Sequence, residues 1–409
     1  MELSRIIIIG LCTAVYVCIV RCLRYRRVEA IRSKHGMLSR SDFAGLTADQ
    51  AQDVLQELVE MEFPKLMGFS IVFSLFKTYA LSSVSSLLTT TGELSGPETA
   101  SKRTADTGVL ILEFCLNKPS SERSMEAIAR MNYLHSQYIK AGKISNDDLL
   151  FTLSLFALEP VRWIGKYEWR SLSDFECCAS GTFWKAIGDR MEIDFSILPS
   201  YKCGWTDGLH WLNEVQAWSE QYERNHMLPA GTNHRLALAH LDVIFLNIPE
   251  RVKSIGHYLV AAVVGERVQK AMMLPQPSWI ALQALDMIAL LRKVAMRWLF
   301  LPRFEWGRKK YISPAPQQNG RYSAREYLSY PWYVNPTFSR RWGLKAWITR
   351  LLGRKLPGDD DNKYSPEGYK ILEVGPTKWK SSGSMHMDQD LLKMRASKPG
   401  SCPFAMKSD

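Results

Sequence analysis

Several patterns that mark common enzyme classes are missing from this chain of 409 residues. It has no G-x-G-x-x-G segment after a strand, no P-loop and no G-x-S-x-G elbow, so the standard motifs for dinucleotides, nucleoside triphosphates and serine hydrolases are absent. Neither H-E-x-x-H nor a Glu-x-x-His pair repeated on two helices occurs, and the eight histidines are scattered. A metal site built from several side chains is therefore unsupported by any motif.

A disulfide framework is also absent, although the chain has eight cysteines. No C-x-x-C pair occurs. Cys12, Cys18 and Cys22 lie in or beside the apolar N-terminus, whereas Cys177 and Cys178 are adjacent. Such spacing fits free thiols in a reducing compartment better than a disulfide scaffold.

Long uncharged runs are scarce, with one exception at the N-terminus. Residues 6–20 (IIIIGLCTAVYVCIV) carry no charge, and Cys22 and Leu23 extend the run. Residues 6–20 cover about 22 Å of a roughly 30 Å hydrocarbon core, which predicts one short span suited to a thin bilayer such as that of the endoplasmic reticulum. We therefore predict a membrane anchor at 1–23. A cleaved signal peptide is the weaker alternative, because the start is barely basic and no small-x-small site follows.

Positive charge is concentrated after this run. Residues 24–40 form a basic juxtamembrane segment, which predicts a lumenal N-terminus and a cytosolic body, hence a single-pass protein of the endoplasmic-reticulum membrane. The whole chain has a net charge of +11, yet it contains no zinc-finger spacing, basic zipper or RNP signature. We expect membrane lipid, and no nucleic acid, as the partner of these charges.

Period-two alternation with hairpin turns is missing, whereas helical spacing is found throughout residues 41–301. Ser41 or Thr47 can cap the first helix of this region. A capping box from Ser95 to Glu98, with Pro97 in the first turn, predicts the start of another helix, and Gly142 predicts the end of the next. The fold class is therefore all-α, with one N-terminal transmembrane helix and a helical core at 41–301.

The C-terminal quarter has a different composition. Repeated prolines predict an extended connector at 302–374 that contains an amphipathic helix at 340–355. That helix fits the headgroup region of a membrane and fits a plain surface helix about equally well. The apolar stretch 279–301 is interrupted by charges, so we predict a core helix, membrane-proximal at most, rather than a second span. Residues 375–409 are polar and predict a mobile tail.

His135 is the histidine with the most suggestive setting. At helical spacing it shares a face with Ile128, Met131, Tyr138 and Ile139. A neutral imidazole in an apolar wall is what an iron porphyrin needs on its proximal side. From spacing alone, however, a core histidine is the more common explanation of this pattern.

A second group of polar residues lies on the preceding helix. Arg103 and Thr107 are four residues apart on one face, where a cation and a hydroxyl can address a propionate, bound oxygen or a substrate carboxylate. Asp106 offers the simpler alternative of a surface ion pair with Arg103.

Three more residues complete the set of candidates. Glu93 and Glu98, near the start of the same helix, are possible general bases, although the capping box already explains Glu98. Arg130 could reach a haem propionate only from the flank of its helix, and a solvated surface arginine is the alternative.

Three segments together resemble a known family. They are TTTGELSGPETASKRTADTGVLI, ARMNYLHSQYIKAGKISNDDLLFTLSLFALEPVRWI and WRSLSDFECCASGTFWKAIGD. They resemble the fungal endoplasmic-reticulum oxygenases of mycophenolic acid biosynthesis (the MpaB type), and the likeness covers almost the whole chain. More distantly, the core is similar to the bacterial latex-clearing proteins, the rubber oxygenases.

The resemblance implies a globin-like helical core that holds haem b and uses O2 to cleave a carbon–carbon double bond in the isoprenoid, farnesyl-type side chain of a meroterpenoid. It makes His135 the axial iron ligand and matches Arg103 and Thr107 to the Arg-x-x-x-Thr pattern of the rubber oxygenases. Asp106 stands where those enzymes can have a lysine that caps the iron. Glu98 is the counterpart we assign to their catalytic glutamate, and Arg130 is assigned to the cofactor site.

Two other functions remain open from the sequence. One is a non-enzymatic, membrane-anchored protein that binds haem or lipid. The other is a non-haem iron oxygenase that uses the scattered histidines and carboxylates. The expected small-molecule partner is a prenylated substrate, and no pattern indicates an oligomeric state.

Overall fold

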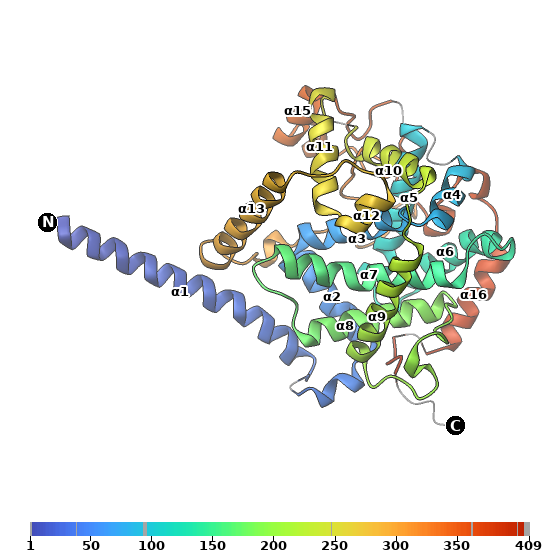
Figure 1. Ribbon diagram of the computed structural model, residues 1–409, viewed down its shortest axis with the longest axis horizontal. Helices are drawn as coiled ribbons and strands as arrows, with labels where there is room; N and C mark the ends of the chain where they lie inside the picture. Colours follow the sequence, from blue (N-terminus) through green and yellow to red (C-terminus); the bar gives the residue numbers. More distant parts are fainter. Residues whose placement is uncertain are drawn as a thin grey trace.

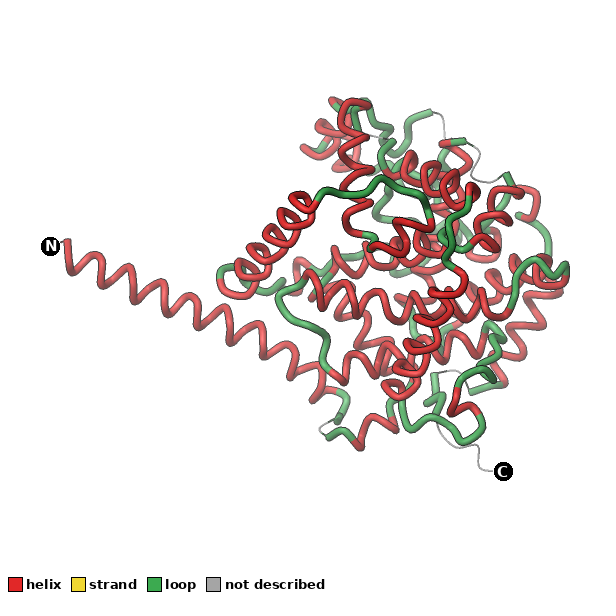
Figure 2. Tube along the Cα trace, viewed as in Figure 1, coloured by secondary structure: helices red, strands yellow, loops and turns green. Residues whose placement is uncertain are grey.

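The computed structural model describes residues 2–37, 39–92, 96–246, 248–360, 363–398 and 400–404. In these ranges the chain is helical, contains no strand and has only three isolated bridges, which confirms the all-α prediction (Figure 2). The globin-like arrangement stays a prediction.

The longer helices are α1 (Glu2–Lys34), α2 (Ala48–Glu57), α3 (Pro64–Thr78), α4 (Ser82–Thr91), α5 (Pro97–Leu116), α6 (Glu122–Lys140), α7 (Asn146–Tyr167), α8 (Asp174–Arg190), α9 (Gly208–His226), α10 (Gly231–Ile244), α11 (Glu250–Val263), α13 (Trp279–Trp298) and α16 (Ser384–Ala396). The shorter ones are α12 (Glu266–Ala271), α14 (Phe338–Trp342) and α15 (Leu344–Leu351).

Helix α1 projects from the helical body into open space (Figure 1). Its segment Ser4–Lys34 is long and apolar enough to cross a membrane and is almost entirely unburied by the rest of the chain. The predicted boundary between anchor and basic segment, at residue 23, falls inside this one continuous helix. Among the described residues, α3 and α4 pass the same test only as a pair bent by 91°, and many side chains of α3 are buried in the body.

The core of the body is built around α7 and α8. Helix α3 packs along α7, and α8 lies between α2 and α9. Two glycines allow α8 and α9 to approach closely: a Cβ on Gly181 would lie 1.9 Å from the carbonyl oxygen of Gly208. Helices α5 and α6 pack side by side, and α10 packs against α4 and α5. This arrangement brings parts of six helices around one interior space.

The local signals in the sequence explain where several helices begin and end. Thr47 caps α2 in a capping box with Gln50, so Thr47 rather than Ser41 is the cap. Helix α6 ends at Lys140, and Gly142 follows with a φ of +64°, as its position predicted. Helix α5 begins at Pro97 with Gly96 at the N-cap position. The predicted capping box of Glu98 involves Ser95, which lies outside the described residues.

Two regional predictions were wrong. Helix α13 was expected in the core, but none of its residues is buried. The last segment was expected to be mobile, but α16 packs on α6 with Met387, Leu391 and Met394 buried, and the backbone carbonyl of Ser401 accepts a hydrogen bond from the amide of Ala48. A polar composition therefore does not prevent a helix from docking through three apolar side chains.

The connector at 302–374 is extended, as its prolines predicted, but it is part of the core. Val334 and Tyr369 are buried within the main hydrophobic cluster. The amphipathic segment 340–355 forms the end of α14 and all of α15, where Trp347 and Ile348 are about half exposed. Its position at a membrane surface stays a prediction.

Candidate functional site

A cavity of about 210 Å³ lies between α3, α4, α5, α6, α7 and α10. Most of its wall is apolar, with side chains such as Leu75, Leu88, Leu110, Met131 and Leu134. The segment 375–379, which directly follows the connector, closes one part of it. Four predicted site residues line this cavity: Arg103, Asp106, Thr107 and His135.

His135 presents its ring to the cavity from α6. No hydrogen bond joins either ring nitrogen to a described residue, and the side chain is partly exposed. Burial, with a smaller contribution from the positive charge of Arg103, lowers the pKa of His135 from 6.5 to about 4. The imidazole is therefore neutral at ordinary pH and has a lone pair free for a metal.

Arg103 and Thr107 are joined on α5 as their spacing predicted. The Arg103 Nη1 donates a hydrogen bond to Thr107 Oγ1 over 3.1 Å, and both residues line the cavity. The nearby phenol of Tyr79 is also buried in the cavity wall, and burial raises its pKa to about 12. Tyr79 stays protonated and can donate a hydrogen bond into the cavity.

Asp106 has a different partner from the one expected. Its carboxylate pairs with Lys102 at 2.6 Å and accepts a hydrogen bond from the Tyr333 hydroxyl at 2.6 Å, so the anticipated surface pair with Arg103 is not formed. Only 2% of Asp106 is exposed, and burial raises its pKa although Lys102 and Tyr333 oppose the shift. Lys102 also donates to the carbonyl of Gly375 at 3.0 Å. This group ties α5 to the connector at the edge of the cavity.

Glu98 lies apart from these residues. It is exposed at the start of α5, forms an ion pair with Lys363 at 2.6 Å and does not line the cavity. The structure therefore does not bring it near His135. The other carboxylate considered, Glu93, lies outside the described residues.

Arg130 is buried, and the alternative of a solvated surface arginine was wrong. Its guanidinium donates to the backbone carbonyls of Val374 at 2.7 Å, Trp379 at 2.8 Å and Ser382 at 3.2 Å. It does not line the cavity. Its contacts instead hold in place the segment 375–379 that forms part of the cavity wall.

His240 is a site residue that the sequence reasoning missed. It lies on α10, is 2% exposed, and neither ring nitrogen has a hydrogen-bond partner. Its ring contacts Phe76 and Tyr79, with centroids 5.8 and 5.3 Å apart, and burial lowers its pKa to about 4. No local pattern marks it, because its surroundings come from α3 and not from its own helix.

A second cavity of about 400 Å³ adjoins the first. Leu75, Thr104 and His240 line both cavities and thus form the wall between them. The second cavity is almost wholly apolar, with Ile71, Val109 and other aliphatic or aromatic side chains around it. It suits a long hydrocarbon chain, because burial of apolar surface is its main available interaction.

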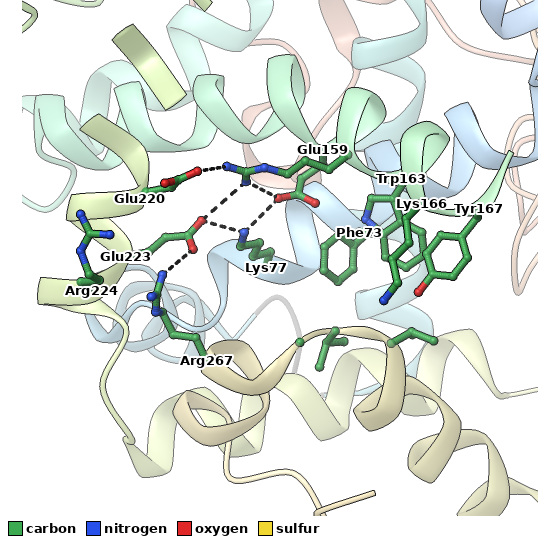
Figure 3. Close-up of a pocket in the computed structure, with 14 residues that line it drawn as sticks. Phe73, Lys77, Glu159, Trp163, Lys166, Tyr167, Glu220, Glu223, Arg224 and Arg267 are labelled. Carbon is green, nitrogen blue, oxygen red and sulfur yellow. Dashed lines mark hydrogen bonds and ion pairs between the residues drawn. The ribbon is translucent and has the colours of Figure 1, made fainter. Parts of the chain in front are cut away.

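A third, charged cleft lies between α7, α9 and the turn before α12 (Figure 3). Lys77 pairs with Glu159 at 2.9 Å and with Glu223 at 2.7 Å, and Arg162 and Arg267 add further pairs to the same carboxylates. The acids of this network are satisfied by neighbouring bases. We therefore assign the network to holding helices together and not to chemistry.

Among the residues that the structure describes, no three side chains of histidine, cysteine, aspartate or glutamate come together as a metal site. A non-haem iron centre normally needs such a set. A haem iron needs only one protein ligand, because the porphyrin supplies four. The geometry around His135 fits the second requirement.

No known family profile matches the chain, but several characterised proteins are similar to it. The ER-bound oxygenase mpaB' of Penicillium brevicompactum is 39% identical over 391 residues, which is 95% of this chain and 92% of that protein. The ER-bound oxygenase mpaB of the same fungus is 38% identical over 353 residues, 86% of this chain and 84% of its own length. The enzyme of that name from Penicillium roqueforti is 41% identical over 265 residues, 65% of this chain and 89% of its own.

These identities confirm the resemblance seen in the sequence. They also rule against the alternative of a non-enzymatic carrier, since the relatives are oxygenases. The protein therefore belongs to the family of ER-bound oxygenases of the mpaB type and is an oxygenase.

Proposed function

We propose that the protein is a haem b oxygenase that uses O2 to cleave a carbon–carbon double bond in the isoprenoid side chain of a prenylated substrate. A farnesyl-type meroterpenoid intermediate, such as that of mycophenolic acid biosynthesis, is the substrate that the family resemblance favours. We place the protein in the endoplasmic-reticulum membrane with its N-terminus in the lumen and its catalytic body in the cytosol.

The observation that carries this proposal is His135. A neutral imidazole that faces a mostly apolar cavity, and that no described residue holds by a hydrogen bond, has a ring nitrogen available to bind a ligand. Iron would satisfy that nitrogen. The absence of a three-residue metal cluster among the described residues favours haem iron, for which one histidine suffices, over non-haem iron.

Several residues around the cavity carry groups that a haem could use. Arg103 supplies a cation for a propionate or for an oxygen species, and Thr107 orients that cation through the 3.1 Å hydrogen bond. When bound, the haem would activate O2, which is chemistry that no side chain here can supply. Tyr79 and Thr107 offer hydroxyl donors, while the aliphatic wall keeps water away from the reacting centre.

The adjoining apolar cavity suits the substrate. An isoprenoid chain has no polar groups, so an apolar cavity can bind it but cannot position it by hydrogen bonds. The wall shared by Leu75, Thr104 and His240 would bring one end of that chain next to the cavity that contains His135. The shape of the cavity would decide how far the isoprenoid chain enters it, and thus which double bond is cleaved.

The first test is the absorbance spectrum of the purified full chain, where we expect a Soret band. A His135→Ala variant should lose haem or show a clearly shifted Soret band, because the axial bond is removed. His210→Ala is the matched control: His210 lies near Glu214 at 3.2 Å on α9, away from the cavity, and its loss should leave the spectrum unchanged.

Purified protein with no porphyrin would overturn the proposal, and so would a His135→Ala variant with the haem content and spectrum of the unmodified protein. A pure protein that contains iron without porphyrin would favour the non-haem alternative.

A further inference from the structure

Helix α13 has an unusual surface for a helix that packs on a folded body. None of its residues is buried, and its outer stripe is uncharged. Ile280, Met287, Leu291 and Val294 recur at helical spacing on this stripe and are 49–63% exposed. A water-facing helix normally carries polar residues there, and a large exposed apolar patch indicates contact with a partner or a membrane.

Two cations of α13, Arg292 and Lys293, point the other way, whereas Asp286 and Arg297 are exposed outside this stripe. Arg292 donates to the carbonyl of Tyr167 at 2.8 Å and pairs with Glu168 at 2.8 Å, and Lys293 donates to the carbonyl of Gly165 at 3.3 Å. These contacts bind α13 to the end of α7. Arg292 and Lys293 thus face the protein while the apolar stripe faces outward, which is the reverse of a soluble surface helix.

The end of α13 is fastened to α1. The Tyr16 hydroxyl donates to the carbonyl of Leu299 at 2.7 Å, and Arg24 donates to the carbonyl of Phe300 at 3.0 Å. Arg21 lies over the ring of Trp298 at 4.6 Å. These bonds fix the position of α13 along the axis of α1.

That position coincides with the end of the uncharged run of α1. Residues 6–20 carry no charge, and Arg21 is the first charge after them. If α1 crosses a bilayer, Arg21 and Arg24 lie at the headgroups, where arginines and tryptophans are favoured. Trp298 and Leu299 are then at the same depth, so the exposed face of α13 meets the surface of the same bilayer.

The direction of α13 argues against a second crossing. In Figure 1, α13 lies on the side of the body from which α1 projects and runs across the direction of α1 rather than along it. Its inner side also contacts α7 and α11. Helix α11 extends the apolar face, because Val252, Ile255 and Leu259 are 43–55% exposed.

We infer that α13 and the exposed side of α11 form a membrane-docking surface, which lies in the headgroup and upper acyl region of the bilayer that α1 crosses. The occupant of this surface is phospholipid. Continuity with α1 selects lipid over a second copy of the chain or another protein, since any copy docked there would have to displace the membrane at that depth. The surface would fix the orientation of the catalytic body, whereas a single anchor would let it rotate freely.

The inference can be tested on the full chain in phosphatidylcholine vesicles that contain an alkyne-tagged phosphatidylcholine. A benzophenone amino acid replaces Ile288, which is 62% exposed on α13, or Leu392, which is 64% exposed on α16 as the matched control. Helix α16 lies on the far side of the body from α1 (Figure 1). After irradiation, we expect several-fold more lipid adduct at position 288 than at position 392.

A companion variant tests the stripe itself. Met287→Glu combined with Leu291→Glu should reduce lipid adduct from a benzophenone at position 280, while α1 keeps the protein in the vesicle fraction. Both changes are at exposed positions, so the helical content measured by circular dichroism should not change.

Lipid adduct at position 288 no greater than at position 392 would overturn the inference. A predominant adduct with a second copy of the chain, or with another protein in native membranes, would also overturn it. None of these outcomes depends on haem, so they are distinct from a failure of the proposed function.

Discussion

Burial of His240 destabilises the folded protein, because no hydrogen bond replaces the hydration that its ring loses. Both ring nitrogens are unpaired, and an unsatisfied buried polar group costs about 1–3 kcal/mol. The ring already packs against aromatic side chains in tilted and edge-to-face contacts, and cavities on two sides leave space for an extra atom. Residues of this kind are retained when they serve function at the expense of stability.

We predict that His240→Phe raises the free energy of unfolding by about 1 kcal/mol, because it removes unpaired polar atoms at nearly constant shape. The gain should grow as the pH falls. In the folded protein the pKa is about 4, against 6.5 ordinarily, so acid in this range protonates the unfolded chain and not the native ring. Thermal unfolding between pH 7 and pH 5, without substrate, measures both effects.

His234→Phe is the control, since His234 has a hydrogen bond to the Met272 carbonyl at 2.9 Å and should lose stability when replaced. A His240→Phe variant that is less stable than the parent at every pH would contradict the prediction and would indicate that the imidazole has a partner in the native protein.

Among single residues, the sequence predicted what depends on neighbours along the helix. Spacing alone placed His135 on an apolar side of α6 and joined Arg103 to Thr107. It did not find His240 and mistook the environment of Arg130, because the partners of both come from distant segments. The environment of Asp106 was mispredicted only partly for this reason: its hydrogen-bond donor Tyr333 is 227 residues away, but its ion-pair partner Lys102 lies four residues earlier on the same helix.

At the scale of elements, the docking of α16 on α6 can be tested by replacing two adjacent leucines of α16. Leu391 is 6% exposed, whereas its neighbour Leu392 is 64% exposed. Leu391→Ala should lower the free energy of unfolding by about 2–5 kcal/mol, the usual cost of emptying a buried leucine site. Leu392→Ala should change it little. Equal effects in chemical denaturation would show that α16 does not pack as described.

Arg130 on α6 holds the segment that forms part of the cavity wall, so its replacement should loosen that segment and leave distant helices unchanged. In Arg130→Met, the carbonyls of Val374, Trp379 and Ser382 lose their donor. We expect faster amide hydrogen exchange across 374–382, with little change in α9. A variant with unchanged exchange in that segment would show that other contacts suffice to close the cavity wall.

The sequence predicted where helices begin and end better than it predicted what surrounds each helix. Caps such as Thr47 and Gly142 act within a few residues, so the sequence shows them directly. The misplacement of α13 has a physical cause: a strongly apolar helix fits either a protein core or a lipid surface, and hydrophobic spacing is the same in both. Only the contacts of α13 with α1 and α7 distinguish the two environments.

For the molecule as a whole, the charged network around Lys77 joins α3, α7, α9 and α12. Lys77→Met should lower the free energy of unfolding at neutral pH by less than the about 3–5 kcal/mol of a fully unpaired buried charge, because Glu159 and Glu223 would keep only their partly exposed partners Arg162 and Arg267. Lys270→Met removes only an exposed pair with Glu266 and should be nearly neutral.

The same network predicts acid sensitivity. Burial raises the pKa of Glu159, but the pairs with Lys77 and Arg162 outweigh burial and leave the pKa below its ordinary value of 4.5. The contribution of Glu159 to stability is thus complete above pH 4.5 and is lost as the pH falls through the lower folded value. In Lys77→Met this loss on acidification should shrink. Denaturant titrations from pH 6 to pH 3 would show whether the two curves converge.

The path of the chain through the fold constrains the order in which parts of the structure can form during synthesis. Helix α1 leaves the ribosome first and can enter the membrane while the rest is being synthesised. Part of the wall of the His135 cavity, however, comes from 375–379, and the amides that start α2 pair with carbonyls at 400 and 401. The cavity that contains His135 therefore lacks part of its wall until residues 375–379 have been synthesised, and the start of α2 lacks these partners until residues 400 and 401 follow.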